Sequence, residues 1–421
     1  MKKTSYLLAA LLVVALGTGV ATVTSTPAYA QADADKNKGP SIRAEMGKLY
    51  QEIQTALNNK DYAAATEKAN AMAAMDKVTP YEMYTIQRLR AAIAMGKNDQ
   101  PAVAVAMEAM LASEFLSPAE RKSFTSSVAG TYFNSKQYPK AREWAKRYLE
   151  LEADSAQMRN LIARTYYLEN DFVNSAKAME ELLAADAKTG AKPSEENLRL
   201  TYSAYQNAKD NTNAARMLEK MVEFYPQKET WADLIYRLKS RPGFSERLLL
   251  DAYRIQFATD NVEEGAEYVD MAELAMLAGL PVEAKIYIDA GFDKKLVGAG
   301  KDAVKHKQLR DRIHKQAAQD VKELDAGEAT AKNAKTGVGL VNIGYNYVVN
   351  NQVERGIALI EQGISKGGLK SLDEAKLHLG MAYLKAGKRD KAKEVFATIQ
   401  STDGAADLGR YWLYVQSDAS K

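Results

Sequence analysis

Two stretches of sequence decide the fold: residues 128–150, VAGTYFNSKQYPKAREWAKRYLE, and residues 162–183, IARTYYLENDFVNSAKAMEELL. In each, a small residue precedes a tyrosine by three positions, and an aromatic residue follows a short polar turn. The matching positions lie 34 residues apart: Ala129 and Ala163, Tyr132 and Tyr166, Tyr138 and Phe172. Self-similarity at a fixed period of this size is typical of a repeat architecture.

Apolar residues recur at helical spacing from Ser41 onward, and short polar clusters such as Asn98-Asp99 and Asn170-Asp171 separate the runs. The one β-branched patch, residues 338–349, also keeps helical spacing. Helices joined by tight turns therefore account for the chain, and the predicted fold class is all-α. The spacing predicts about nine helical hairpins, which start near residues 46, 83, 122, 156, 195, 228, 265, 337 and 373.

Near the carboxyl end the pattern returns as Leu340-x-x-Ile343-Gly344-x-x-Tyr347 and Leu379-Gly380-x-x-Tyr383, and second helices carry a small residue such as Ala141 or Ala392. This pattern resembles the tetratricopeptide repeat (TPR) family. The resemblance implies a right-handed α-solenoid in which small residues let paired helices approach and stacked hairpins complete one another's core. A last helix, Ala405 to Val415, is expected to cap the stack.

The predicted organisation has three parts after the amino-terminal leader. Residues 41–291 form an N-terminal solenoid, residues 292–336 an irregular insert with a long basic helix, and residues 337–421 a C-terminal repeat pair with its cap. The insert's helix is predicted over 301–324, with a flexible or subdomain boundary around 325–336. Its expected buried face consists of Leu309, Ile313, Ala317 and Val321.

The first thirty residues read as a cleavable signal peptide, with basic Lys2 and Lys3, an apolar run over 6–16 and a small-x-small site at Ala28-Tyr29-Ala30. Cleavage would leave a polar linker over 31–40. No later segment is apolar enough to span a bilayer. The expected location is the periplasm, with secretion as the alternative.

The amino-acid composition limits the kinds of metal site and catalytic site that the chain could form. The chain has no cysteine and only three histidines, His306, His314 and His378, without acids at metal-ligand spacing. We therefore predict no metal, no cofactor and no enzyme activity. A net charge of +3 over 421 residues offers no case for nucleic acid.

By resemblance, ligands of the TPR family lie along the first helices of successive hairpins. In the middle repeats this face is polar and carries Arg164, Tyr167 and Arg199. In the C-terminal pair it is apolar, and soluble proteins seldom leave such a stripe open. A partner segment could cover it, or helix 301–324 or the cap could fold onto it; its residues are Val341, Tyr345, Val348, His378, Met381 and Leu384.

The long helix carries a local excess of basic residues, including Lys301, Lys305 and Arg312. A solvated helix face is the ordinary interpretation. The alternative is contact with an anionic surface, such as membrane headgroups or an acidic partner.

These observations favour a non-enzymatic periplasmic scaffold that binds a protein or peptide of the cell envelope through its concave surface. The competing hypothesis is an enzyme, or an enzyme regulator, that acts on a cell-wall or glycan substrate and uses the solenoid as scaffold. The competing hypothesis requires acids and aromatic residues that converge in one cleft.

Overall fold

The computed structural model describes residues 40–416, and the secondary structure in this range is helical, without a strand. The predicted all-α class is confirmed. The signal peptide over 1–30 and all but the last residue of the linker over 31–40 lie outside the described residues. The chain divides into two compact units between Asp210 and Asn211, inside the solenoid that the sequence predicted over 41–291.

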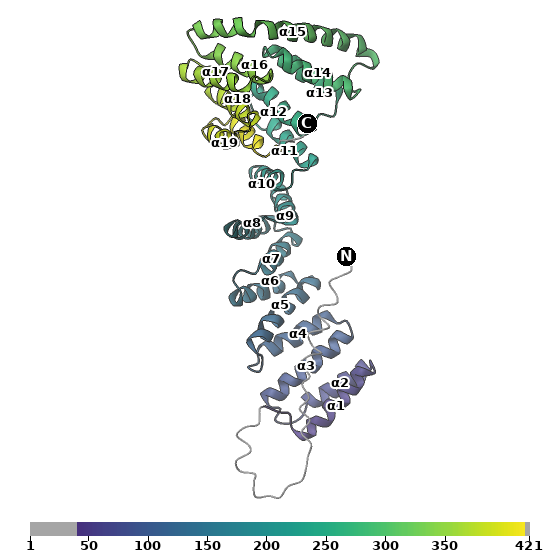
Figure 1. Ribbon diagram of the computed structural model, residues 1–421. Helices are drawn as coiled ribbons and strands as arrows, with labels where there is room; N and C mark the ends of the chain where they lie inside the picture. Colours follow the sequence, from purple (N-terminus) through teal and green to yellow (C-terminus); the bar gives the residue numbers. More distant parts are fainter. Residues whose placement is uncertain (1–39, 417–421) are drawn as a thin grey trace. The chain divides into compact units, whose positions relative to one another are not determined.

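Unit 1 is a stack of helical hairpins in which each helix packs on its neighbours in the chain (Figure 1). The pairs are α1 with α2, α3 with α4, α5 with α6 and α7 with α8, and α9 follows them. Their bounds are α1 (Ala44–Asn58), α2 (Tyr62–Ala73), α3 (Pro80–Gly96), α4 (Gln100–Leu111), α5 (Pro118–Asn134), α6 (Tyr138–Leu151), α7 (Ala156–Leu168), α8 (Phe172–Thr189) and α9 (Glu195–Asn207).

The polar clusters between these helices are turns with one repeated geometry. Asn98 and Asn170 adopt left-handed backbone angles, φ 56° and 63°, which asparagine tolerates better than most residues. The aspartate that follows each of them, Asp99 or Asp171, caps the next helix by accepting a hydrogen bond from a backbone N–H. Each turn therefore ends one helix and starts its antiparallel partner.

Unit 2 contains the remaining hairpins, a long helix and a short terminal helix. Each predicted hairpin start lies within a first helix of one of the two units, or one residue before it. The bounds in unit 2 are α10 (Asn211–Phe224), α11 (Lys228–Ser240), the short 3-10 helix η1 (Glu246–Leu248), α12 (Leu249–Ala258), α13 (Gly265–Leu277), α14 (Pro281–Asp293), η2 (Gly300–Asp302), α15 (Ala303–Asn333), α16 (Val338–Val349), α17 (Val353–Lys366), α18 (Leu372–Lys385), α19 (Arg389–Ala397) and α20 (Ala405–Trp412).

Small residues set the spacing inside the hairpins, as the repeat pattern predicts. A methyl group added to Gly380 would lie 2.2 Å from the Phe396 ring, and one added to Gly344 would lie 2.8 Å from the carbonyl oxygen of Gly356. Ala141 and Ala392 are fully buried. The paired helices thus approach closely because these positions lack larger side chains.

Helix α15 corrects two predictions. It continues to Asn333, so residues 325–333 are helical and not a flexible boundary, because Leu324, Glu328 and Ala331 pack into the structure. The predicted face is right at Leu309, Ile313 and Ala317 but wrong at Val321, which is 52% exposed. Residues four apart drift around a helix of 3.6 residues per turn, so the buried face passes to Leu324.

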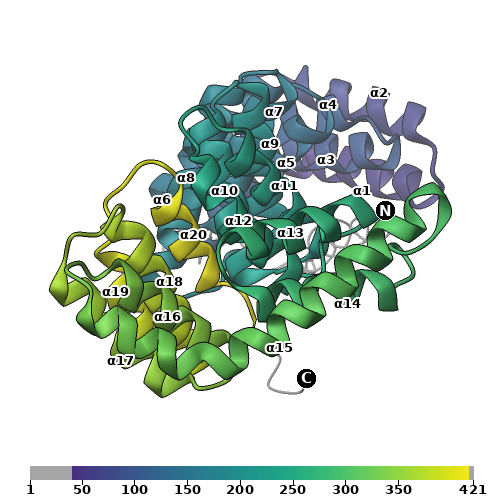
Figure 2. The ribbon, with the colours of Figure 1, turned by 90° about the horizontal axis from the view of Figure 1, so that it is seen from above.

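Helix α20 does more than cap the stack. It packs on α18 and α19, and also on α12 near the start of unit 2 (Figure 2). The Arg410 guanidinium makes two 3.0 Å hydrogen bonds with the Glu219 carboxylate of α10, and the Tyr411 ring meets that of Trp231. The last helix therefore joins the end of unit 2 to its beginning.

Candidate functional site

The first candidate site is a polar surface on unit 1 formed by the first helices α7 and α9, called here the α7/α9 surface. Asn160, Arg164 and Tyr167 lie on one face of α7 because they are four and three residues apart. Each bonds to α9: Asn160 Nδ2 donates to Asn197 Oδ1 at 2.7 Å, Arg164 pairs with Glu196 at 2.6 Å, and the hydroxyls of Tyr167 and Ser203 lie 2.7 Å apart.

Two partly exposed guanidinium groups are the main hydrogen-bond donors of this surface. The Arg164 side chain is 45% exposed and the Arg199 side chain is 50% exposed, and Arg199 pairs with Glu195 one turn earlier at 2.8 Å. Exposed ion pairs of this kind contribute little to stability. About half of each side chain is exposed to solvent, where a partner's carboxylates or carbonyls could reach it. The structure therefore brings the predicted Arg164, Tyr167 and Arg199 together.

The second predicted surface, on α16 and α18, is not an open stripe. Tyr345 is only 6% exposed, Val348 and Met381 are buried, and Leu384 is half-buried. The Tyr345 ring stacks on the His378 ring with their centroids 4.6 Å apart. Val341 lies instead inside the α16–α17 hairpin, against Gly363.

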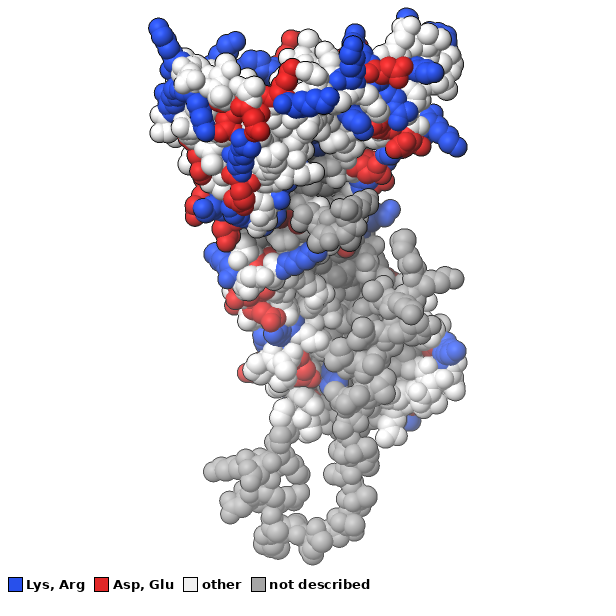
Figure 3. Space-filling view, turned by 45° about the horizontal axis from the view of Figure 1, so that its top comes forward, with Lys and Arg blue, Asp and Glu red and all other residues white. Residues whose placement is uncertain are grey.

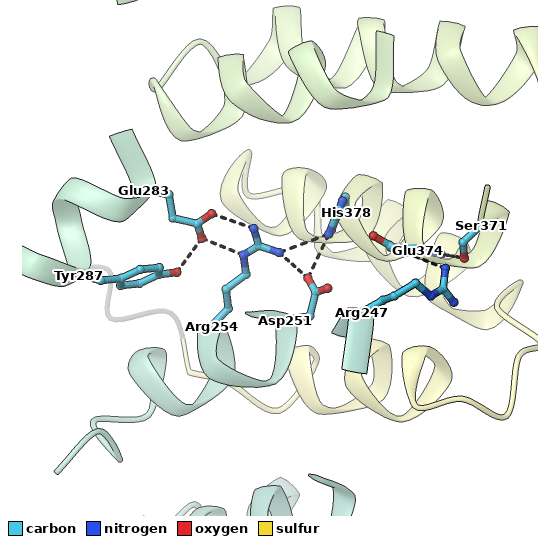
Figure 4. Close-up of polar contacts among 8 residues, drawn as sticks. All are labelled: Arg247, Asp251, Arg254, Glu283, Tyr287, Ser371, Glu374 and His378. Carbon is cyan, nitrogen blue, oxygen red and sulfur yellow. Dashed lines mark hydrogen bonds and ion pairs between the residues drawn. The ribbon is translucent and has the colours of Figure 1, made fainter. Parts of the chain in front are cut away.

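Side chains of helix α12 lie against Tyr345 and His378 on this face, and the cap α20 also packs on α18. The Arg254 guanidinium lies 4.8 Å from the centre of the Tyr345 ring. Arg254 also donates to Asp251 Oδ1 at 2.5 Å, and that oxygen lies 3.0 Å from His378 Nε2 (Figure 4). Asp251 and Arg254 are both buried. The cap is thus one part of the internal cover, as one of the alternatives drawn from sequence had it, and α12 supplies covering side chains that the sequence did not predict.

A buried network of ion pairs and hydrogen bonds extends from this point to α14. Arg254 binds Glu283 with two parallel hydrogen bonds of 2.7 Å, and the Tyr287 hydroxyl donates to the same carboxylate at 2.6 Å. We call this set, with Asp251 and His378, the Arg254 network. Bidentate pairing of this kind fixes both geometry and charge.

Burial and charge shift the ionisation of the Arg254 network. Burial by itself would raise the pKa of Asp251, but the charges of His378 and Arg254 outweigh it and lower that pKa to about 2. Burial raises the pKa of Tyr345, and burial together with Glu283 raises the pKa of Tyr287. Asp251 therefore stays ionised, and both hydroxyls stay neutral, near neutral pH.

Sequence reasoning missed Asp251, Arg254 and Glu283. A signal was present, because Asp251 and Arg254 interrupt the apolar run LLLDAYRIQF at residues 248–257. Charged residues within a buried helix need partners, so such a run predicts an ion-pair network. It does not say which distant helix supplies the partners.

Beside the Arg254 network lies a cavity of about 560 Å³, called here the unit 2 pocket. Residues of α12, α14, α16 and α18, the start of α19 and the end of α20 line it, and most of their side chains are apolar. Tyr345, Val348, Met381 and Leu384 belong to its wall. Four of the predicted site residues are therefore brought together, although in the wall of a pocket and not along an open stripe.

The other two histidines and the basic positions of the long helix lie elsewhere. His306 accepts a hydrogen bond from the Gly298 backbone at 3.2 Å, and His314 lies 2.8 Å from Asp289. Over residues 40–416, His, Asp and Glu side chains form no group of three or more arranged to hold a metal ion, and no helix has the length and apolarity of a membrane span. Lys305 pairs with Asp302 at 3.5 Å.

Basic side chains on unit 2 are interspersed with acidic ones (Figure 3). Contact of Lys301, Lys305 and Arg312 with an anionic surface stays a prediction.

Comparisons with known proteins give low similarity. Neither a family model nor a curated protein matches the sequence. Among solved structures, the C-terminal part of a TPR repeat-containing protein from Cytophaga hutchinsonii is 14% identical, with a TM-score of 0.29 over 63% of this chain and 93% of that one. The apo form of RapI is 11% identical, with a TM-score of 0.28 over 65% and 99%. BtubC from P. vanneervenii is 15% identical, with a TM-score of 0.26 over 64% and 91%.

These scores are too low to support a conclusion about function. The fold rests on the helix pairs themselves, with their capped turns and their close contacts at Gly344 and Gly380. Each unit is a stack of TPR-like helical hairpins.

Proposed function

We propose that this protein is a non-enzymatic scaffold of the periplasm, and that its α7/α9 surface binds a segment of a cell-envelope protein. The observation that carries the proposal is the pair of half-exposed guanidinium groups of Arg164 and Arg199, held on adjacent first helices. The signal-like sequence over residues 1–30 supports export. A stack of hairpins supplies the rigid frame that recognition of an extended segment needs.

The geometry of the α7/α9 surface also bears on the kind of partner that it would bind. The hydrogen bonds from Asn160 and Tyr167 to α9 fix the two helices side by side, so the guanidinium groups keep a defined spacing. Arginine favours carboxylate partners because its fork can donate two parallel hydrogen bonds. A segment with acidic side chains would bind these arginines in place of Glu196 and Glu195, whose exposed ion pairs contribute little to stability.

The competing enzyme hypothesis requires acids that are free to act in a cleft. The acid in the wall of the unit 2 pocket, Glu283, is bound by both Arg254 and Tyr287, and Asp251 beside it is bound by Arg254. These contacts support a structural role for both carboxylates.

Site-specific photo-crosslinking in intact cells tests the scaffold proposal. A photoreactive residue in place of Leu168 or Gln206, which are exposed on α7 and α9 and leave both arginines intact, should yield one discrete adduct with an envelope protein, identified by mass spectrometry. The matched control replaces Val173, which is exposed on the second helix α8, and should yield none. Equal labelling from all three positions, or an adduct with a cytoplasmic protein, would contradict the proposal.

Export has its own measurement. The chain recovered from a periplasmic extract should begin at Gln31, because the small-x-small site ends at Ala30. Recovery of residues 1–30 in the mature protein would remove the periplasmic part of the proposal and leave the binding surface to be judged by crosslinking.

A further inference from the structure

We propose that the unit 2 pocket binds a single-chain amphiphile with an anionic head, of the class of long-chain carboxylates. This site lies within unit 2 and does not depend on the α7/α9 surface. Its volume of about 560 Å³ falls within the range of roughly 300–1,000 Å³ that is typical of small-ligand pockets.

The walls of the pocket suit an alkyl chain. Phe257 and Ile286 come from one side, and Val348, Met381, Leu384 and Trp412 from the others. Ile286 is exposed although it is large and apolar, so a ligand in the pocket could remove its surface from water. Covering apolar surface of this kind is the main source of affinity for an alkyl chain.

Charge is distributed unevenly between the inside of the pocket and its mouth. The charged side chains deep in the wall, Arg254 and Glu283, neutralise each other. The exposed charged residues in the lining, Lys385 and Arg389, are both basic. Lys385 gives one hydrogen bond to the Val348 carbonyl at 2.8 Å, and its ammonium group has two further donors. An anionic head at the mouth would meet both cations while its chain lies inside.

A peptide fits this pocket less well. Its backbone would bring N–H and C=O groups that need hydrogen-bond partners once they leave water. The polar groups deep in the wall are already bonded to one another, since Arg254 and Tyr287 both donate to Glu283. An alkyl chain makes no such demand, so the arrangement favours a single-chain amphiphile.

Isothermal titration of the purified protein with decanoate, laurate and dodecanol, each below its aggregation concentration, tests the proposal. Laurate should bind more tightly than decanoate by about tenfold or more, since each buried methylene adds about 0.8 kcal/mol. Dodecanol has the chain of laurate without its charge and should bind about tenfold more weakly than laurate.

Two sets of variants locate the site. The double variant Lys385→Gln and Arg389→Gln should weaken laurate to the level of dodecanol while leaving dodecanol unchanged, which a general loss of structure would not do. Lys305→Gln, an exposed lysine on α15, is its control. Ile286→Asp should abolish laurate binding, whereas Leu277→Asp, an exposed apolar residue outside the pocket, should not.

The proposal is overturned if laurate fails to bind, if affinity is the same for decanoate and laurate, or if dodecanol equals laurate. It is also overturned if an apolar heptapeptide with a free carboxyl end binds in the pocket and laurate does not displace it, because the site would then recognise peptides. Equal effects of Ile286→Asp and Leu277→Asp would place the binding elsewhere.

Discussion

The first helices of this protein present two kinds of face, and the α7/α9 surface and the α16/α18 face show the contrast. On α7 and α9 the residues are polar, Arg164 and Arg199 are half-exposed, and the bonds run between neighbouring first helices. On α16 and α18 the equivalent face is apolar and buried, and Tyr345 is enclosed by His378 and Arg254.

The difference shows that the same position in a repeat can be exposed in one hairpin and enclosed in another. In unit 2, α20 and α12 bring the end of the stack back to its start, so the face of α16 and α18 turns inward. Its apolar residues then contribute to the core, and the unit 2 pocket lies beside them. An apolar first-helix face is therefore a sign of closure as readily as of a binding groove.

The largest expected effect follows from removing the enclosed residues. Tyr345→Ala together with Met381→Ala should lower the free energy of unfolding by about 5 kcal/mol, because both side chains are buried and leave a cavity. Urea unfolding followed by tryptophan fluorescence measures it, in a Trp144→Phe background where the remaining tryptophans, Trp231 and Trp412, lie in unit 2.

Leu372→Ala is the control for that variant, since Leu372 is an exposed apolar residue of the same helix α18. It should change stability by less than about 0.5 kcal/mol. If the double variant unfolds like the parent protein and loses partner capture instead, the α16/α18 face is a recognition surface and the contrast with α7/α9 disappears.

The second effect concerns the Arg254 network. Arg254→Met should destabilise unit 2 by about 4 kcal/mol, because Asp251 and Glu283 would remain buried without their shared cation. The same fluorescence experiment measures it. Lys294→Met, which breaks a surface pair with Asp260, should cost less than about 1 kcal/mol. Comparable losses from the two variants would mean that the Arg254 network is no more buried than a surface pair.

Much of this architecture could be predicted from local sequence patterns. The 34-residue interval, the Asn-Asp turns and the small residues such as Gly380 and Ala392 act between neighbours in the chain, and all the predicted hairpin starts correspond to observed first helices. The end of α15 was wrong by nine residues because residues 325–333, rich in alanine and polar side chains, carry no strong stop signal before Asn333.

The candidate sites divide in the same way. Arg164, Tyr167 and Arg199 could be predicted, because their spacing and that of their neighbours defines one face of two successive helices. The cover over Tyr345 could not be predicted, because the Asp251–His378 contact joins residues 127 positions apart in the sequence. No local sequence pattern determines how far a stack of hairpins curves. Burial of the α16/α18 face follows from that curvature.

The third prediction concerns pH. The pKa of Asp251 is about 2 in the folded protein and about 4 when unfolded, so its ionised form stabilises the fold above about pH 4. As the pH falls through about 2, this contribution of about 2 kcal/mol is lost. The free energy of unfolding, measured from pH 5 down to pH 2, should therefore fall more steeply for the parent protein than for Asp251→Asn. Parallel curves would show that Asp251 is not held by His378 and Arg254.

The smallest expected effect on stability is on the α7/α9 surface, where the function is proposed to lie. Arg164→Ala together with Arg199→Ala removes two exposed ion pairs, with Glu196 and Glu195, and should cost less than about 1 kcal/mol. Thermal melting followed by circular dichroism should stay within a few degrees of the parent protein. Crosslinking from Gln206 of α9 should nevertheless fall at least tenfold.

A substitution that unfolds unit 1 would show that these arginines serve closure, as Arg254 does. A substitution that changes neither stability nor crosslinking would show that the guanidinium groups do not contact the partner, and the α7/α9 surface would lose its role in recognition.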